Sequence, residues 1–255
     1  MNSSVLPAAD PQQLAAPTPT RFTLLHSSAE SGLDARHDES LLELCIHNGP
    51  LASIWQTQRS LVVPRSYRRF DAFEDARQHF AGLGWPVTVR QTGGGIVPQG
   101  PGILNLSLAY TVQGPPMQHS EPGYQRICQL LADALRALGI KTFPAAVEGS
   151  FCDGRYNLAV DRQGKPVKIA GTAQSWRRIP GSKDGHMGLV HALVLLDTDT
   201  AAVTETANAF EAALGSERRY EADKVVSAAE WLGSSYDLQN RFENALERAL
   251  ANLRV

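Results

Sequence analysis

A predicted β-hairpin constrains the fold of this chain more than any other segment. Residues 156–161 place their larger apolar side chains at alternate positions, which is typical of a β-strand. Gln163 and Gly164 supply the turn, because glycine tolerates a positive φ angle. Residues 166–170 form the returning strand, which is predicted to end at Gly171, where a backbone can approach a ligand closely. The chain therefore contains antiparallel β structure.

The periodic spacing of apolar residues predicts further strands and helices on both sides of the hairpin. Strands are expected at residues 22–25, within 51–63 as two strands around a polar turn, and at 85–90, 102–110 and 187–196. Helices are expected at residues 37–47, from a cap at Asp71 to about Leu83, at 121–139, and near 200–214, 220–232 and 237–252. Because strands and helices do not alternate strictly, we predict an α+β fold. Its sheet is mixed, mainly antiparallel and flanked by helices, rather than doubly wound and parallel.

Composition and charge narrow the class of protein. Hydrophobic residues make up 43% of the 255 residues and charged residues 20%, which is ordinary for a globular protein. The net charge of −2 gives no reason to expect nucleic acid or a membrane surface as a partner. No apolar run reaches the ~18 residues of a spanning helix. Residues 1–20, rich in Ala, Pro, Gln and Thr, are predicted to be a flexible tail without the features of a secretory signal.

The three cysteines form no CxxC pair, which argues against a disulfide framework and a zinc site and favours a reducing, cytoplasmic environment. Cys45 lies among apolar residues of a predicted short helix and Cys128 on an apolar helix stripe, and a free cysteine packs in such places as a small hydrophobe. Cys152 differs, because residues 150–155 (SFCDGR) have a polar, glycine-containing loop composition. A thiol reacts as its thiolate, which nearby Arg155 or Lys168 would favour. A passive cysteine remains the alternative.

The hairpin also brings candidate chemical groups together. It places the loop before its first strand near the end of its second, so Cys152 and Lys168 are expected to face one pocket. A lysine that points into a pocket can hold a carbonyl oxygen or a phosphoryl group, whereas a solvated strand position is the alternative. His186 and His191 flank or lie on the strand at 187–196, either as general bases or as core histidines with satisfied hydrogen bonds.

A run of three glycines follows the strand at 85–90. Gly93, Gly94 and Gly95 expose consecutive backbone N–H groups, which can form a concave donor surface for a carbonyl, carboxylate or phosphate. Arg90 adds a charged donor. A simple hairpin turn that closes residues 87–90 onto 104–109 is the alternative. The segment is not a phosphate-binding P-loop, because no Gly-Lys-Ser/Thr follows.

Three segments together resemble the lipoate–protein ligase and octanoyltransferase family, whose fold is shared with biotin–protein ligases and is similar to class II synthetases. Residues 89–95 (VRQTGGG) are similar to that family's R-x-x-G-G-G acyl-binding loop. Residues 102–108 (GILNLSL) resemble its N-x-S strand, and residues 168–174 (KIAGTAQ) resemble its K-x-x-G-x-x-Q segment. The resemblance covers roughly residues 38–215. It implies a catalytic domain at 21–215 and a helical extension at 216–255 packed on that domain.

A finer resemblance concerns residues 148–158 (EGSFCDGRYNL), which look like the cysteine-dependent branch of the family, the octanoyl amidotransferases that relay octanoyl groups from the glycine-cleavage H protein. It implies that Cys152 forms a thioester with the acyl chain and that Lys168 contacts the acyl carbonyl. The substrate-binding residues implied by the resemblance are Arg90, Gly93, Gly94, Gly95, Asn105, Arg155, Gly171 and Gln174. No metal ligand is implied.

The resemblance leaves three functions open. The first is an acyltransferase of protein lipoylation that needs no cofactor. It moves an octanoyl or lipoyl group through Cys152 to a lysine of a lipoyl-domain protein, such as the glycine-cleavage H protein or a 2-oxoacid dehydrogenase E2. Its donor is either acyl carrier protein or the H protein. The second is a lipoate–protein ligase that uses ATP and magnesium and an acyl-adenylate held by Lys168. The third is a non-catalytic acyl or lipoyl-domain binding protein.

Two departures from the family pattern argue against acyl adenylation. Ligases usually carry a histidine just after the glycine loop, where this chain has Pro98 and Gln99. Many ligases also have a C-terminal accessory domain, whereas about 40 residues with helical patterns follow Gly215 here.

Overall fold

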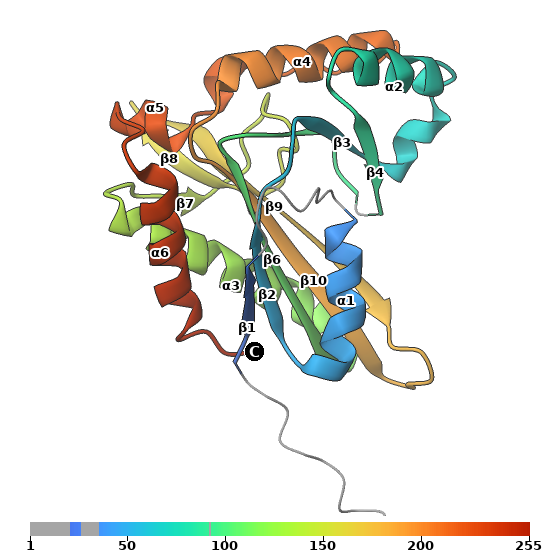
Figure 1. Ribbon diagram of the computed structural model, residues 1–255, viewed down its shortest axis with the longest axis vertical. Coiled ribbons are helices and arrows are strands. Elements are labelled where there is room, and N and C mark those ends of the chain that lie inside the picture. The colour runs from blue at the N-terminus through green and yellow to red at the C-terminus, as the bar shows by residue number, and fades with distance from the viewer. Residues whose placement is uncertain (1–20, 27–35, 92) are drawn as a thin grey trace, which may run out of the picture.

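The computed structural model describes residues 21–26, 36–91 and 93–255. The predicted tail at residues 1–20 lies outside these described residues. Figure 1 shows a large twisted sheet at the centre, with helix α1 on one face, helices α3 and α6 on the other, and a smaller sheet with helices α2 and α4 above it. The predicted α+β fold is confirmed.

Within the described residues, the large sheet has seven strands in the order β1-β2-β6-β10-β9-β8-β7. Its β1–β2 pair is parallel, and the other pairs found there are antiparallel. Its strands are β1 (Thr23–His26), β2 (Leu51–Trp55), β6 (Ile103–Gln113), β7 (Phe143–Pro144), β8 (Leu158–Arg162), β9 (Lys165–Arg178) and β10 (Gly185–Leu195).

The predicted hairpin is formed by β8 and β9. Gln163 and Gly164 make its turn with φ angles of 56° and 80°, the left-handed conformation that two-residue hairpin turns require. The prediction that the second strand ends at Gly171 is wrong. Strand β9 continues to Arg178, because its second half pairs with β10 from Ala170 onward.

Helices cover both faces of the large sheet. Helix α1 (His37–Asn48) packs on one face through Leu41, Leu42 and Cys45. Helices α3 (Pro116–Ala137) and α6 (Leu238–Leu250) contact each other and share the largest core cluster on the other face. Helix α3 begins five residues earlier than predicted and holds Pro122 inside its second turn, where a proline normally signals a helix start.

The smaller sheet has the order β4-β3-β5 and belongs to a separate core with two helices. Its elements are β3 (Ser60–Pro64), the 3₁₀ helix η2 (Arg65–Arg69), α2 (Phe73–Gly82), β4 (Val87–Arg90), β5 (Val97–Gln99) and α4 (Thr200–Ala213). The alternative of a hairpin turn onto residues 104–109 is wrong, because β4 pairs with β3 in parallel. The predicted cap at Asp71 is also wrong, since the N-cap position of α2 is Ala72, without a side-chain hydrogen bond.

The C-terminal part is less helical than predicted. Residues 220–232 contain only the short 3₁₀ helix η3 (Ala222–Lys224) and helix α5 (Ala228–Leu232), and Val225 bridges to Lys168 on β9. The division between a catalytic domain and an extension at residue 215 stays a prediction. No helix of the described residues combines the length and apolarity that crossing a membrane requires.

Candidate active site

Cys152 lies in the loop before β8, and Lys168 on β9 reaches that loop. The Lys168 ammonium donates hydrogen bonds to the carbonyl oxygens of Phe151 at 2.6 Å and Cys152 at 2.9 Å. The Asn157 side-chain amide also donates to the Cys152 carbonyl, at 2.9 Å. An ammonium group has three donors, and that of Lys168 has two acceptors among the described residues, so one N–H remains for a ligand. The structure therefore brings the two predicted catalytic residues together.

The backbone of Cys152 is held in an uncommon conformation. Its φ angle is 55°, in the left-handed region that non-glycine residues seldom adopt. The three hydrogen bonds that its carbonyl accepts, from Lys168, Asn157 and the backbone N–H of Gly154, fix this conformation. Strain of this kind costs on the order of 1–3 kcal/mol and is concentrated at functional sites.

Arg90 organises the glycine loop beside the cysteine. Its guanidinium donates to the carbonyls of Val62, Gly93 and Gly95 at 3.2, 2.9 and 2.7 Å. A Cβ atom on Gly94 would lie 2.9 Å from the Cys152 sulfur and 3.1 Å from the Arg90 guanidinium. The loop thus packs directly against the thiol, and only glycine leaves room for it. The Arg90 Nε atom is buried and has no hydrogen-bond partner among the described residues.

Burial of cations around the thiol makes this site electrostatically costly. Lys168 is 1% exposed, and burial lowers its pKa to about 8, helped by the charge of Arg90 and opposed by those of Cys152 and Asp153. Burial likewise lowers the pKa of Arg90 from its usual range, while the neighbouring Cys152 acts against this shift. A negative charge that forms between the two cations would offset the free-energy cost of burying them.

Two cavities meet at Cys152. The apolar pocket, with a cavity volume of about 70 Å³, lies between the two sheets and opens in part to solvent. Its apolar wall consists of Leu42, Trp55, Val62, Val97, Leu189 and Leu193. The second cavity, which we call the open groove, is wider and is lined by Gly93, Gly94, Gly95, Gln174, Arg218 and Tyr220, among others. Thr172 and Ala173 line both cavities, so a ligand that fills the pocket can extend into the groove.

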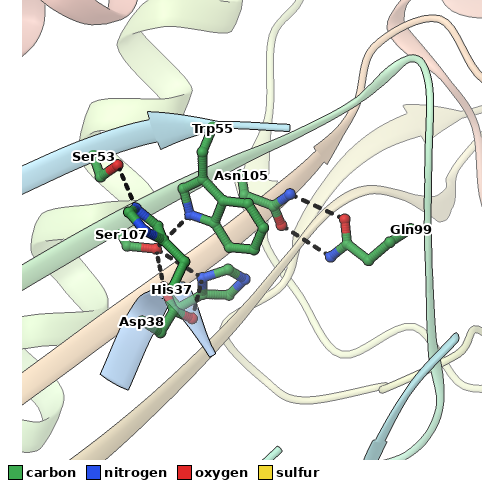
Figure 2. A network of polar contacts seen from close by, with 8 residues as sticks. His37, Asp38, Ser53, Trp55, Gln99, Asn105 and Ser107 are labelled. Carbon is green, nitrogen blue, oxygen red and sulfur yellow. Dashed lines mark hydrogen bonds and ion pairs between the residues drawn. The ribbon is translucent and has the colours of Figure 1, made fainter. Parts of the chain in front are cut away.

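A polar network stands against the apolar pocket, on the face of the sheet that α1 covers (Figure 2). Ser107 on β6 donates to Asp38 at 2.5 Å and accepts from the Trp55 indole at 3.0 Å. His191 Nδ1 lies 3.1 Å from both Ser107 and Asp38. His37 contacts Ser53 at 2.9 Å, and burial lowers the pKa of this imidazole.

Not every predicted binding residue reaches a cavity. Asn105 is fully buried, and its amide exchanges two hydrogen bonds with Gln99, so Gln99 faces the apolar pocket in its place. Arg155 is exposed and stacks over the Tyr156 ring at 4.7 Å, and it lines neither cavity. Gln174 lines the open groove while bonded to Ser120 and Trp176. Gly171 lies beside the Lys168 ammonium. A Cβ atom on Gly171 would be 3.1 Å from the ammonium nitrogen.

The other two cysteines pack in the core as predicted. Cys45 is 1% exposed and Cys128 is 5% exposed, and burial raises the pKa of each thiol to about 11. No group of three or more His, Cys, Asp or Glu side chains that could hold a metal ion occurs in the described part of the chain.

Sequence reasoning missed a second buried network behind the glycine loop. Tyr67 and Tyr220 both donate to Glu211 on α4, at 2.5 and 2.8 Å, and the Tyr67 hydroxyl accepts from the Ile96 N–H. Arg218 also donates to Tyr67, at 3.3 Å. These residues are far apart in the sequence and form no motif. Their hydrogen bonds connect the glycine loop to helix α4 and to Arg218.

The family comparison agrees with this architecture. The profile of the lipoyl protein ligase A/B catalytic domain matches residues 34–250. An uncharacterized protein of Cupriavidus necator is 48% identical over 223 residues, which cover 85% of this chain and 88% of that protein. The octanoyl-GcvH:protein N-octanoyltransferase of Kyrpidia tusciae is 36% identical over 132 residues, which cover 50% of this chain and 43% of that enzyme.

Solved structures show the same fold. A lipoate-protein ligase A bound with ATP is similar with a TM-score of 0.63 at 18% identity, over 91% of this chain and 84% of that one. The bipartite lipoate protein ligase of Thermoplasma acidophilum has a TM-score of 0.60 at 19% identity, over 91% and 83% of the two chains. The chain therefore belongs to the lipoyl protein ligase A/B catalytic domain family, and it is an enzyme of the lipoate–protein ligase and octanoyltransferase group.

Proposed function

We propose that this protein is an acyltransferase of protein lipoylation that carries an octanoyl or lipoyl group as a thioester on Cys152. The observation that carries the proposal is the position of Cys152 at the junction of the apolar pocket and the open groove, beside Lys168 and Arg90. A nucleophile at such a junction can reach the carbonyl of an acyl chain whose tail fills the pocket. Cys45 and Cys128 lack this access because they are buried in the core.

In the first step the Cys152 thiolate attacks the acyl carbonyl carbon of a donor. A carbon–sulfur bond forms, and the bond from the carbonyl carbon to the donor breaks. Arg90 and Lys168 both lie close to Cys152, and the third N–H of Lys168 can donate to the oxyanion that develops. A thioester donor leaves as a thiolate, whereas an amide donor leaves as an amine and takes up a proton.

In the second step a lysine amine of the acceptor enters through the open groove and attacks the thioester. The carbon–nitrogen bond forms, the carbon–sulfur bond breaks, and Cys152 returns as thiolate while the nitrogen loses a proton. The name of the Kyrpidia tusciae relative specifies octanoyl-GcvH as a donor, and the Thermoplasma acidophilum ligase was studied with its E2 lipoyl domain. We therefore propose lipoyl-domain proteins as acceptors, with either an acyl carrier protein or a lipoyl-domain protein such as GcvH as donor.

Intact-protein mass spectrometry tests the proposal. The protein and its Cys152→Ala variant are incubated with octanoyl-acyl carrier protein, and in parallel with octanoyl-GcvH, without ATP. We expect a hydroxylamine-labile octanoyl adduct on the parent protein and none on the variant. If neither donor yields an adduct on the parent, the thioester mechanism is wrong.

An ATP-dependent ligase is the second candidate, and the open groove favours it. Arg218 and Arg219 line that groove next to the three glycines, and cations beside exposed backbone N–H groups suit a phosphate-bearing substrate. A lipoate-protein ligase A of the same fold binds ATP. In this mechanism Lys168 would contact an acyl-adenylate and Cys152 would be dispensable. Modification of a lipoyl domain by the Cys152→Ala variant with octanoate, ATP and magnesium would establish it.

A further inference from the structure

The proposed function leaves the polar network of the apolar pocket without a role. Ser53, Ser107 and His191 stand directly opposite one another on β2, β6 and β10, so their side chains share one face of the sheet. Helix α1 adds Asp38 to this row from above. Asp38 and His191 line the pocket, whereas Ser107 lies behind them. A pocket that takes only an alkyl chain gains nothing from an ionisable pair at its wall.

The hydrogen bonds define which nitrogen of His191 carries a proton. The single hydroxyl hydrogen of Ser107 goes to Asp38, at 2.5 Å. His191 Nδ1, at 3.1 Å from both the Ser107 oxygen and the Asp38 carboxylate, must then be the donor to these acceptors. This differs from a Ser-His-Asp triad, in which the hydroxyl and the carboxylate bond to different ring nitrogens.

His191 Nε2 is consequently left for a ligand. No partner for this atom is found among the described residues, and the His191 side chain keeps 18% of its surface exposed. Trp55, whose ring centroid lies 5.9 Å from that of His191, packs beside the imidazole and is itself bonded to Ser107. The imidazole is thus fixed in position by three neighbours, and its second nitrogen remains available to the pocket.

The register places this nitrogen at the distal end of a bound acyl chain. Gly171, which adjoins the Lys168 ammonium, pairs with Leu193 on β10. His191 is two residues from Leu193 along β10 and on the same face. At the rise per residue of a β-strand, these two residues are about 7 Å apart. An extended eight-carbon acyl chain spans roughly 8–9 Å, judged from the reach of an extended chain. A chain with its carbonyl at Lys168 therefore ends beside His191.

We infer that the apolar pocket selects an acyl chain that carries a thiol or hydroxyl group on its distal carbons, recognised by His191 Nε2. The inference rests on the proposed function and narrows its substrate. Of the two acyl groups named there, it favours the reduced, thiol-bearing lipoyl group over octanoyl. A thiol or hydroxyl can both donate and accept, so it pairs with Nε2 whether the imidazole is neutral or protonated. A methyl terminus would cover Nε2, shield it from water and leave it without a partner.

Ligand binding to the Cys152→Ala variant tests this without depending on catalysis. Dissociation constants are measured by calorimetry for octanoate, 8-hydroxyoctanoate and 8-mercaptooctanoate, with 2-hydroxyoctanoate as the control that carries its hydroxyl at the wrong end. We expect the two 8-substituted acids to bind about tenfold more tightly than octanoate, and 2-hydroxyoctanoate to show no such gain. Octanoate binding as tightly as the 8-substituted acids, or no binding of any acid, overturns the inference.

A second variant assigns the selectivity to the imidazole. In Cys152→Ala/His191→Leu, whose folding is checked by thermal melting, the preference for 8-hydroxyoctanoate over octanoate should fall by about tenfold. An unchanged preference overturns the role of His191. If the double variant does not fold, the ligand series on Cys152→Ala alone decides the inference.

Acyl loading separates this inference from the proposed function. Octanoyl and 8-hydroxyoctanoyl thioesters of one carrier are offered to the parent protein, and the Cys152 adduct is followed by mass spectrometry. Loading of both chains at equal rates, together with equal affinities of the acids, overturns the inference and leaves the function in place. Selective binding of the acids without any loading overturns the thioester mechanism but supports the pocket selectivity.

Discussion

Lys168 holds the backbone of Cys152 in place, with its ammonium 2.9 Å from the Cys152 carbonyl oxygen. The same ammonium bonds to the Phe151 carbonyl and adjoins Gly171. One buried cation therefore fixes the strained loop conformation and, in the proposed mechanism, stands where the acyl carbonyl reacts. This double role makes the consequences of changing Lys168 specific and measurable.

Replacing Lys168 by methionine should slow acyl loading of Cys152 by about 10²–10³-fold. The variant loses the donor for the oxyanion, and donors of this kind contribute that much to acyl transfer. The rate is measured by mass spectrometry of the thioester. The control is Lys165→Met, a change of the same chemistry at an exposed position three residues earlier on β9. A Lys168→Met rate within a few-fold of the control would show that the ammonium does not act on the carbonyl.

The free energy of unfolding should rise with pH between about 8 and 10 relative to a Lys168→Met variant. Burial lowers the pKa of Lys168 to about 8 in the folded protein, whereas an unfolded lysine has a pKa of roughly 10.4. In this window the unfolded chain binds more protons, so stability increases as the pH rises, by on the order of 3 kcal/mol over the whole window.

The measurement is denaturant unfolding at several pH values. Cys45 and Cys128 lower the free energy of unfolding as the pH rises, because their raised pKa values keep the folded thiols protonated where the unfolded thiols ionise. The relevant quantity is therefore the difference between parent and Lys168→Met, in which these contributions cancel. A difference that stays flat from pH 7 to pH 10 would mean that Lys168 is not titrated in the fold near pH 8.

A methyl group on Gly94 should impair acyl loading more than it impairs folding. Its Cβ would come within 2.9 Å of the Cys152 sulfur, and its φ angle is 105°. Gly139, at the end of α3, is the matched control, since it has a φ angle of 91° and nothing within 4 Å of its Cβ position. Both alanine variants carry backbone strain, of about 1 kcal/mol or more. Only Gly94→Ala displaces the thiol.

The expected result is a similar loss of stability in both variants and a loss of acyl loading of about tenfold or more in Gly94→Ala alone. Thermal melting and thioester formation are measured on the same preparations. Equal loading by Gly94→Ala and Gly139→Ala would show that the close approach of the glycine loop to the thiol has no catalytic consequence.

Local signals in the sequence predicted the parts of the site that one hairpin organises. Gln163 and Gly164 mark the turn of β8 and β9, and this turn alone brings Lys168 back to the loop of Cys152. The burial of Cys45 and Cys128 could be predicted for the same reason, because an apolar cluster or stripe within one helix is a local pattern.

The remaining parts depend on pairing between distant strands. Ser53, Ser107 and His191 belong to three strands, and they align only because the register of β2, β6 and β10 sets them opposite one another. A shift of one residue would turn each side chain to the other face. Asn105 was predicted to bind substrate from a motif, but its orientation toward Gln99 follows from packing between the two sheets. No local pattern carries this information.

Among the three cysteines, Cys152 should be the one that reacts with iodoacetamide in the folded protein. It is partly exposed and lines both cavities, whereas burial raises the pKa of the Cys45 and Cys128 thiols to about 11. Peptide mass spectrometry after a short labelling at pH 7.5 should find the label on Cys152, and all three cysteines labelled in denaturant. Rapid labelling of Cys45 or Cys128 without denaturant would contradict their burial.

Gly102 should tolerate alanine far less than Gly181 does, although both have a φ angle of 77°. An alanine would carry the same backbone strain at both positions, but the free space around its Cβ atom would differ. A Cβ atom on Gly102 would lie 1.9 Å from the Asp197 carbonyl oxygen, and nothing lies within 4 Å of the Cβ position on Gly181. The Gly102 carbonyl also accepts hydrogen bonds from the N–H groups of Leu196 and Asp197, which join the start of β6 to the end of β10.

The added Cβ atom would clash with backbone atoms of Asp197 and Thr198. A side-chain rotation therefore cannot relieve the clash. We expect Gly102→Ala to lose about 3 kcal/mol or more of unfolding free energy beyond the loss in Gly181→Ala, in the range of severe core changes. Urea unfolding of both variants measures this difference. Equal stabilities would mean that the β6 and β10 ends separate at little cost, and the register that aligns Ser107 with His191 would then lack this anchor.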